Sequence, residues 1–230
     1  MTWDWAYAAS ILPDLLYGAW VTIGVTLASS VIALGGGLLI AIAGVTGGRA
    51  VHWAIRILID LLRGVPILVL LYVGFYVLPQ AGITLSALPI GIGVLGVVYA
   101  AFCSEVYRGA LVGIPPGLRD AACALGLSPR QVWQLVLVPL MMRRAAPALM
   151  NYVLVLFKQS AFLFALGIPV LLGKAQEAGY ASFRYLEPFT MAGLLYLAMN
   201  LPFVWLLSRV NPAHGHSAAD RPPKPPRMPS

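Results

Sequence analysis

The amino-acid sequence predicts an all-α integral membrane protein with five transmembrane helices. Hydrophobic residues make up 60% of its 230 residues and charged residues only 10%, whereas soluble domains carry roughly 25% charged residues. A membrane-spanning helix needs about 20 mostly apolar residues, and the chain contains five stretches of that kind. The expected spans are residues 16–44, 54–78, 86–107, 143–166 and 188–208.

The first span is expected because no charged residue lies between Asp14 and Arg49. Residues 1–15 precede it, and they contain no Lys or Arg, so they lack the basic region of a cleaved signal peptide. We expect them to form a short segment outside the bilayer. Three aromatic residues there are typical of interfacial anchors: Trp3, Trp5 and Tyr7.

A run of three glycines, residues 35–37, falls inside the first span. The chain contains no phosphate-binding P-loop pattern, so we interpret these small residues as allowing a close approach between helices. The two cysteines, Cys103 and Cys123, have no metal-ligand or disulfide spacing. We interpret both as packing residues.

The basic residues predict the orientation of the chain, because Lys and Arg gather on the cytoplasmic side of a membrane protein. One side holds only Lys174 and Arg184, with Lys158 within or near the fourth span. The N-terminus is therefore expected to be periplasmic and the C-terminus cytoplasmic. The net charge of +7 is interpreted as setting this topology rather than as binding nucleic acid. The cytoplasmic side holds Arg49, Arg56, Arg108, Arg119, Arg130, Arg143, Arg144, Arg209, Arg221, Lys224 and Arg227.

The transmembrane domain is expected to cover residues 16–210, and residues 211–230 form a separate tail. The tail is rich in proline and basic residues and shows no apolar periodicity, so it is predicted to be disordered and cytoplasmic. His214 and His216 lie in this tail. We interpret them as solvated residues rather than as a metal site.

The segment of about residues 115–139 leaves the bilayer but carries strong helix signals. Pro115 and Pro116 suit a helix start, since a proline lacks only a donor that the first turn leaves unpaired. A helix is expected over residues 117–125, and Gly126 is expected to end it in the left-handed conformation. The alanines at 121, 122 and 124 would form a slim ridge that the groove of another protein can hold.

A second helix is expected directly after Gly126. Ser128 and Gln131, with Pro129 at the first helical position, form a capping-box pattern. Pro139 then leads into the fourth span. The segment is therefore predicted to be an ordered cytoplasmic hairpin, and the alternative is an ordinary loop resting on lipid headgroups. Three residues are expected on one face of the second helix: Val132, Leu135 and Val136.

The hairpin resembles the EAA loop of bacterial ABC importer permeases. That pattern is E-A-A-x3-G-x9-I-x-L-P, and this chain has Asp120, Ala121, Ala122 and Gly126, then nine residues and the sequence VLVP ending at Pro139. Aspartate replaces the family's glutamate, and valine replaces both its isoleucine and its leucine. The alanines, the glycine, the proline and the spacing are retained.

Three further stretches resemble the polar amino acid branch of these permeases, the histidine, glutamine and arginine type. They correspond to the patterns R-G-T-P, E-x-x-R-G and K-D-T-S-L, and with the hairpin the resemblance covers roughly residues 12–210. In the last stretch Gln159 stands for the aspartate and Ala161 for the serine, which leaves the substrate open. The stretches are Arg63–Pro66, Glu105–Gly109 and Lys158–Phe162.

The resemblance implies a function and a set of partners. The chain would be a bacterial inner-membrane permease subunit that pairs with a second permease, identical or related. ABC ATPase subunits would bind its hairpin, and a periplasmic binding protein would deliver a polar amino acid. ATP and magnesium would be bound by the ATPase, and this chain would bind no cofactor. The residues implied in ATPase coupling are Asp120, Ala121, Ala122, Gly126, Leu127 and Pro139.

Charged residues within the spans admit two interpretations. Asp60 and Arg63, at i and i+3, can pair with each other, or Arg63 can meet a ligand carboxylate. Glu105 and Arg108 have the same spacing and are interpreted as a structural pair.

In the fourth span, Lys158 can extend to the membrane surface. Alternatively, Lys158, Gln159 and Ser160 face the substrate path.

Other functions are weighed against the permease. The same class of transporter for a compatible solute or an opine fits the sequence as well. A membrane-embedded enzyme would need a catalytic cluster at one depth, and His52 is the only histidine outside the tail, so no enzyme activity is expected. A membrane channel or scaffold would have no use for a capped hairpin shaped for docking.

Overall fold

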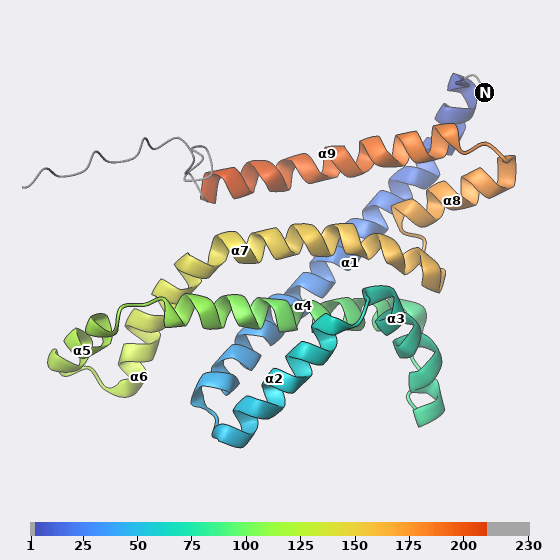
Figure 1. The fold of residues 1–230 in the computed structure, drawn as a ribbon. Coiled ribbons are helices and arrows are strands. Elements are labelled where there is room, and N and C mark those ends of the chain that lie inside the picture. Colours follow the sequence, from blue (N-terminus) through green and yellow to red (C-terminus); the bar gives the residue numbers. More distant parts are fainter. Residues whose placement is uncertain (1–2, 211–230) are drawn as a thin grey trace, which may run out of the picture.

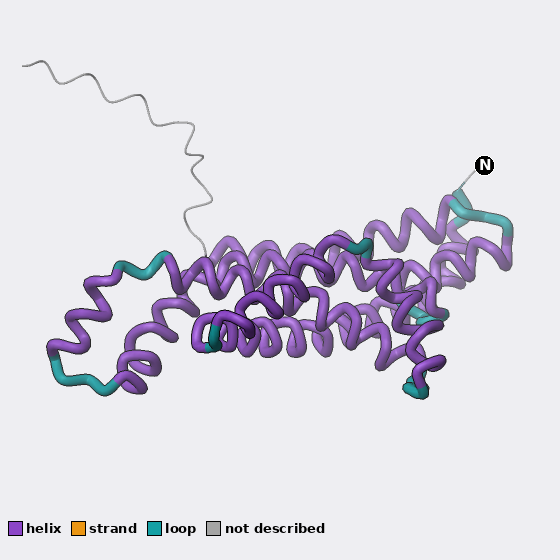
Figure 2. Tube along the Cα trace, turned by 60° about the horizontal axis from the view of Figure 1, so that its bottom comes forward, coloured by secondary structure: helices purple, strands orange, loops and turns teal. Residues whose placement is uncertain are grey.

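The computed structural model describes residues 3–210, and these form helices joined by short turns, with no strand among them. The all-α prediction is confirmed. The helices form an elongated bundle, with the hairpin at one end and the N-terminus and the α8–α9 turn at the other (Figures 1 and 2). The helices are α1 Trp5–Thr46, α2 Arg49–Gly64, α3 Ile67–Tyr72, α4 Ala87–Val112, α5 Pro116–Ala124, α6 Pro129–Gln131, α7 Val138–Gln159, α8 Leu171–Ser182 and α9 Leu186–Val210.

Four continuous helical stretches of the described chain are long and apolar enough to cross a membrane. A fifth span is obtained when the bent pair Arg49–Gly64 and Ile67–Ala81 is counted as one crossing. On that count the predicted number of spans agrees with the structure. The four continuous stretches are Trp5–Thr46, Ala87–Val112, Pro129–Leu166 and Leu186–Trp205.

The first helix is longer than predicted. It begins at Trp5 instead of near residue 16, because the Asp4 carboxylate accepts hydrogen bonds from the backbone N–H groups of Ala6 and Tyr7. Its 42 residues correspond to about 63 Å at 1.5 Å per residue, about twice the bilayer core of ~30 Å. Residues 5–15 of the segment expected to precede the first span are therefore helical.

The second span is not one straight helix as the sequence predicted. Its two parts, α2 and the stretch Ile67–Ala81 that begins with α3, meet at an angle of 104°. Val65 adopts an extended conformation and Pro66 follows it, since a residue before proline is disfavoured in the helical region and proline cannot donate to the preceding turn. On the α2 side of the bend, the charged side chains line a cavity together with residues of α4.

The crossing of α1 and α4 forms the centre of the bundle. At Gly37 the two backbones lie so close that an added Cβ would stand 2.7 Å from the Cβ of Cys103 and 2.9 Å from the carbonyl oxygen of Ala100. The prediction that the glycine run permits close helix approach is confirmed at Gly37. Gly35, by contrast, has open space around its Cβ position. Cys103 is buried in this crossing, as its interpretation as a packing residue required.

A polar cluster at the N-terminal end of the bundle ties α1 to the start of α9. Arg184 bridges Asp4, at 3.2 Å, and Glu187, at 2.5 Å. Glu187 also accepts a hydrogen bond from the backbone N–H of Asp4, and its side chain is buried. The backbone N–H of Tyr7 holds the pKa of Asp4 below its ordinary value. The sequence analysis did not foresee this cluster, because Asp4 is 180 residues or more away from Arg184 and Glu187 in the sequence.

Tyr7 belongs to the same cluster. Its hydroxyl donates to the carbonyl of Ala178, at 2.9 Å, and lies 2.6 Å from the Ser182 hydroxyl. Tyr7 therefore fastens α1 to α8, a role beyond the interfacial anchoring expected for it. The tail predicted to be disordered, residues 211–230, lies outside the described residues.

The glycine crossing can be tested with two matched substitutions in the same run. Gly37→Ala should lower the free energy of unfolding by about 1–3 kcal/mol, because its methyl group overpacks a closed contact. Gly35→Ala adds the same methyl group to open space. It should leave the free energy of unfolding unchanged or raise it, because alanine is about 1 kcal/mol more favourable than glycine in a helix. The thermal unfolding midpoints of the two detergent-purified variants measure the difference. Equal midpoints would contradict the close crossing.

Candidate functional site

The hairpin that was predicted to lie on the cytoplasmic side is ordered by local hydrogen bonds. Helix α5 begins at Pro116, as expected, and ends before Gly126, whose φ is +78°. The N–H of Gly126 donates to the carbonyl of Cys123 at 2.9 Å, and that of Leu127 donates to Ala122 at 3.3 Å. These two bonds form a Schellman motif. The predicted left-handed glycine at position 126 is confirmed.

The predicted capping box starts the second limb of the hairpin. The Ser128 hydroxyl accepts a bond from the Gln131 backbone N–H at 3.4 Å, and the Gln131 side chain accepts one from the Ser128 N–H at 2.8 Å. The helix that begins here does not stop before the fourth span. It continues from Pro129 to Leu166 as one stretch, so the second helix of the hairpin and the fourth span are a single element.

A π-helical turn, Val132–Leu137, lies near the start of this long stretch, and a 3₁₀ helix, Ser160–Leu166, forms its end. The π turn ends two residues before Pro139, which has no N–H for the preceding turn. The π spacing places Val132 and Leu137, five residues apart, on the buried face. The prediction that Leu135 shares a face with Val132 is wrong, because an α-helical spacing was assumed, and Leu135 is 64% exposed.

The outer face of the hairpin differs from the predicted alanine ridge. Ala121 and Ala124 are exposed, but Ala122 is only 5% exposed and packs in the same apolar cluster as Val132. The prediction for Ala122 as part of an exposed ridge is therefore wrong. At the tip, Leu125 is 82% exposed. The sequence analysis missed this residue, although a leucine beside the C-terminal glycine of a polar hairpin was a usable signal.

Other hairpin residues are exposed as well. Asp120 and Cys123 lie on the surface, so the interpretation of Cys123 as a packing residue is wrong. Leu127 is half-buried and packs against the main core, and Pro139 is exposed on the long helix.

Arg144 closes the base of the hairpin. Its guanidinium, on α7, donates to the carbonyl of Gly113, the residue that ends α4. The bond joins the helix that enters the hairpin to the helix that leaves it. The sequence analysis used Arg144 only to predict orientation, and the partner carbonyl 31 residues earlier could not be foreseen from spacing.

The rigidity of the hairpin can be tested at two glycines of the same segment. Gly126→Val should raise amide exchange of Leu125 and Leu127 by about tenfold, because a left-handed φ costs a side-chain-bearing residue ~1–2 kcal/mol. Gly117→Val is the control, since this glycine is helical and has open space around its Cβ position. Hydrogen–deuterium exchange with mass spectrometry gives the rates. Unchanged exchange in Gly126→Val would exclude the motif as the source of order.

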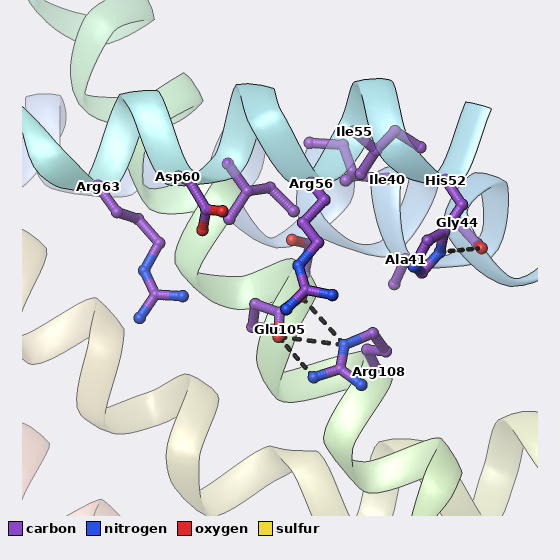
Figure 3. A pocket seen from close by; sticks show the side chains of 12 residues that line it. Ile40, Ala41, Gly44, His52, Ile55, Arg56, Asp60, Arg63, Glu105 and Arg108 are labelled. Carbon is purple, nitrogen blue, oxygen red and sulfur yellow. Dashed lines mark hydrogen bonds and ion pairs between the residues drawn. The ribbon is translucent and has the colours of Figure 1, made fainter. Parts of the chain in front are cut away.

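A second feature is a cavity of about 360 Å³ between α1, α2 and α4. Its α4 wall carries the predicted pair of Glu105 and Arg108, which is confirmed at 2.7 Å, with two further bonds of 3.1 Å from the Arg108 Nε to both carboxylate oxygens. His52 closes one end of the cavity, with its Nδ1 3.2 Å from the carbonyl oxygen of Gly44. Figure 3 shows these residues with the charged side chains of α2.

The α2 wall carries Arg56, Asp60 and Arg63, all exposed and directed toward α4 (Figure 3). Asp60 and Arg63 were expected to be able to pair, but within the described chain no ion pair joins them. The Arg63 guanidinium instead lies 4.9 Å from the centre of the Phe102 ring, a cation–π contact.

The predicted path residues of the fourth span lie elsewhere and do not act as one group. Lys158 is exposed beside a separate cavity of about 450 Å³ between α7 and α9. Ser160 is buried and donates to the carbonyl of Phe157 at 2.7 Å. The side-chain oxygen of Gln159 is buried without a partner in the described chain. The structure therefore does not bring these three residues together with Arg63.

The described helices form a bundle long enough to cross a membrane, with an ordered polar hairpin at one end and a charged cavity inside. This is the form of a membrane transport protein. Comparison with known sequences identifies the family. Residues 33–214 match the model of the family described as binding-protein-dependent transport system inner membrane component. The chain belongs to this family.

Curated relatives align along most of their length. A probable amino-acid ABC transporter permease protein of Sinorhizobium fredii is 35% identical, over 87% of this chain and 89% of that protein. The glutamine transport system permease protein of Escherichia coli is 31% identical, over 91% and 97%. The arginine transport system permease protein of Bacillus subtilis is 28% identical, over 87% and 92%.

Solved structures share the fold. An amino acid ABC transporter crystallised with histidines superposes with a TM-score of 0.84 at 28% identity, covering 91% of this chain and 98% of that chain. An inward-facing methionine ABC transporter superposes with a TM-score of 0.69 at 21% identity, over 87% and 98%.

Proposed function

We propose that this chain is the permease subunit of an ABC importer that carries a polar amino acid or an amino-acid-like solute across the bacterial inner membrane. The observation that carries the proposal is the similarity to amino-acid ABC transporter permeases over nearly the whole chain, both in sequence and in fold. The hairpin with the EAA-like pattern lies within the matched region. The relatives are transport subunits, and ATP hydrolysis is assigned to a partner chain.

The hairpin is the proposed contact with the ATPase. Asp120, Ala121 and Gly126 lie on its exposed side, and Leu125 offers an apolar tip that is otherwise left in water. Exposed apolar side chains of this kind are typical of docking surfaces. Closure of the ATPase dimer around ATP and magnesium would move the hairpin, and α4 and α7, which continue into it, would transmit the movement. Ala122 and Leu127 would support this contact from within, and Pro139 would lie in the transmitting helix.

The remaining partners follow from the same proposal. A second permease, identical or related, would complete the path, and a periplasmic binding protein would deliver the ligand. The N-terminus would be periplasmic and the C-terminus cytoplasmic. The positions of the hairpin and the N-terminus at opposite ends of the bundle support this orientation (Figure 1), as does the clustering of basic residues on the hairpin side.

Uptake by proteoliposomes tests the proposed function. Proteoliposomes that contain the permease with its ATPase and binding protein should take up radiolabelled L-glutamine or another polar amino acid. They should do so only when ATP is supplied on the side of the membrane where the ATPase lies. Gly126→Val should reduce this uptake by up to about tenfold at equal membrane content, because ~1.4 kcal/mol of strain in the hairpin shifts the equilibrium between its docking-competent and other conformations by that factor.

Gly117→Val is the matched control and should transport at the wild-type rate. Uptake that is independent of ATP would contradict an ABC importer. Uptake of betaine-type solutes or opines, with none of the amino acids, would keep the transporter class and change the substrate.

A further inference from the structure

We propose that the groove between α7 and α9 binds an anionic phospholipid of the surrounding bilayer, with the lipid phosphate on Lys158 and an acyl chain along the groove. The groove has a volume of about 450 Å³, within the range of roughly 300–1,000 Å³ that small-molecule sites occupy. It is separate from the charged cavity between α1, α2 and α4. The lipid binds whichever solute is carried, and only the leaflet that it comes from rests on the proposed orientation.

The groove combines an apolar wall with a single charged group. Phe157, Ala161 and Leu197 supply the apolar part, and Lys158 is the one charged residue among the described residues that line it. Leu197 is 55% exposed and Lys158 is exposed as well, so the groove opens on the surface of the bundle. A site of this composition suits an amphiphile, because an acyl chain can cover the apolar wall while a charged headgroup meets the lysine.

Lys158 needs an anion that the described chain does not supply. No ion pair joins it to an acidic residue of residues 3–210, whereas the other lysine of that range, Lys174, pairs with Glu177 at 2.7 Å. An unpaired ammonium group inside a bilayer is unfavourable, so such groups pair with an anion or extend to the lipid headgroups. The phosphate group of a lipid satisfies both requirements at once.

The depth of Lys158 favours a lipid of the outer leaflet. Lys158 lies on α7 fourteen residues after Arg144, which holds the base of the hairpin. Fourteen residues of helix span about 21 Å, so about 9 Å of a ~30 Å bilayer core remains beyond Lys158. A lysine side chain near the end of a span extends to the headgroup region, where the phosphate of an outer-leaflet lipid lies.

The exposed face of α9 favours lipid over a protein as the neighbour of the groove. Helix α9 runs along the outside of the bundle beside α7 (Figure 1). Contacts between helices in a membrane use small residues that let the backbones approach closely, whereas leucine and valine are among the residues that insert most favourably into lipid. The exposed stripe of α9 consists of large aliphatic side chains: Leu194, Leu197, Leu201 and Val204.

The polar groups of the groove select an anionic headgroup that also has hydrogen-bond donors. Lys158 gives the groove a charge of +1, which the phosphate of phosphatidylglycerol neutralises and a zwitterionic lipid does not. The side-chain oxygen of Asn200, in the same wall, is buried without a partner in the described chain. This oxygen can accept a hydrogen bond from a headgroup hydroxyl, which phosphatidylcholine lacks. We therefore expect phosphatidylglycerol to bind more tightly than phosphatidylcholine.

Photolabelling of the intact permease–ATPase complex in phosphatidylcholine nanodiscs tests the site. The probes are phosphatidylglycerol and phosphatidylcholine with the same photoactivatable acyl chain, each at a low mole fraction. Phosphatidylglycerol should label residues 157–161 and 194–201 more strongly than phosphatidylcholine. Lys158→Gln should lower this labelling about tenfold, because a hydrogen bond between charged groups is lost. Lys158→Arg, which keeps the charge, should restore it.

Two further variants separate the headgroup from the acyl chain. Lys174→Gln, the matched control on α8, should label as the wild type does. Ala161→Leu fills the groove from its wall and should lower the labelling of residues 194–201 by both lipids. Labelling around Trp20 and Val31, which are exposed on α1, should be the same in every variant and thus report correct insertion.

Four results would overturn the lipid site. Equal labelling of the wild-type groove by both lipids, or full phosphatidylglycerol labelling of Lys158→Gln, would show that the lysine holds no phosphate. Displacement of phosphatidylglycerol by L-glutamine would assign the groove to the solute path. A cross-linked permease dimer, formed on oxidation of Lys158→Cys in a Cys123→Ser background, would show that a second copy covers the groove. ATP-dependent uptake, measured separately, decides the proposed function in each case.

Discussion

The close crossing of α1 and α4 is the contact on which the rest of the structure depends. Gly37 brings the two backbones together at one point, and Gly96 does so at another, where an added Cβ would stand 2.6 Å from Ile32. Without a hydrophobic driving force between helices in lipid, such small-residue contacts are what holds spans together. The turn after α1 leads directly into α2, and α4 leads directly into the hairpin. One crossing therefore sets both walls of the charged cavity and the base of the hairpin.

The hairpin is fixed by local hydrogen bonds at its tip and at its base, and it contains one π-helical turn between them. The Schellman motif at Gly126 and the capping box at Ser128 fix its tip, and Arg144 fixes its base on Gly113. Between tip and base lies the π-helical turn Val132–Leu137, a form that is rare and frequent at functional positions. A force applied to the tip would thus reach α7 through one well-defined irregularity, instead of being lost in a flexible loop.

Local chemistry is what the sequence predicts well. The positions of the helix start at Pro116, the left-handed Gly126 and the Ser128–Gln131 box follow from interactions within a few residues, and all three are confirmed. The i, i+3 pair of Glu105 and Arg108 is confirmed for the same reason.

Features that depend on distant residues or on a change of helical period were not predictable from the sequence. Leu135 points outward because the turn around it is π-helical. Asp60 and Arg63 remain apart because the ring of Phe102, brought by α4, competes for the guanidinium. The cluster of Asp4, Arg184 and Glu187 joins residues from opposite ends of the chain. Pro66 is a sequence signal for a break in the second span, but the angle of the bend depends on how α3 packs.

The continuity of α4 relates the cavity to the hairpin. Arg108, in the cavity wall, lies five residues before Gly113, where the hairpin begins, and five residues of helix span about 7.5 Å. Among the described residues, the opposite wall, α2, is joined to α4 by side-chain packing and by the cation–π contact of Arg63 with Phe102. A displacement of the hairpin therefore moves one wall of the cavity relative to the other and changes the distances available to a ligand held between them. Because such coupling is reciprocal in free energy, a ligand that fits one spacing better must also favour one position of the hairpin.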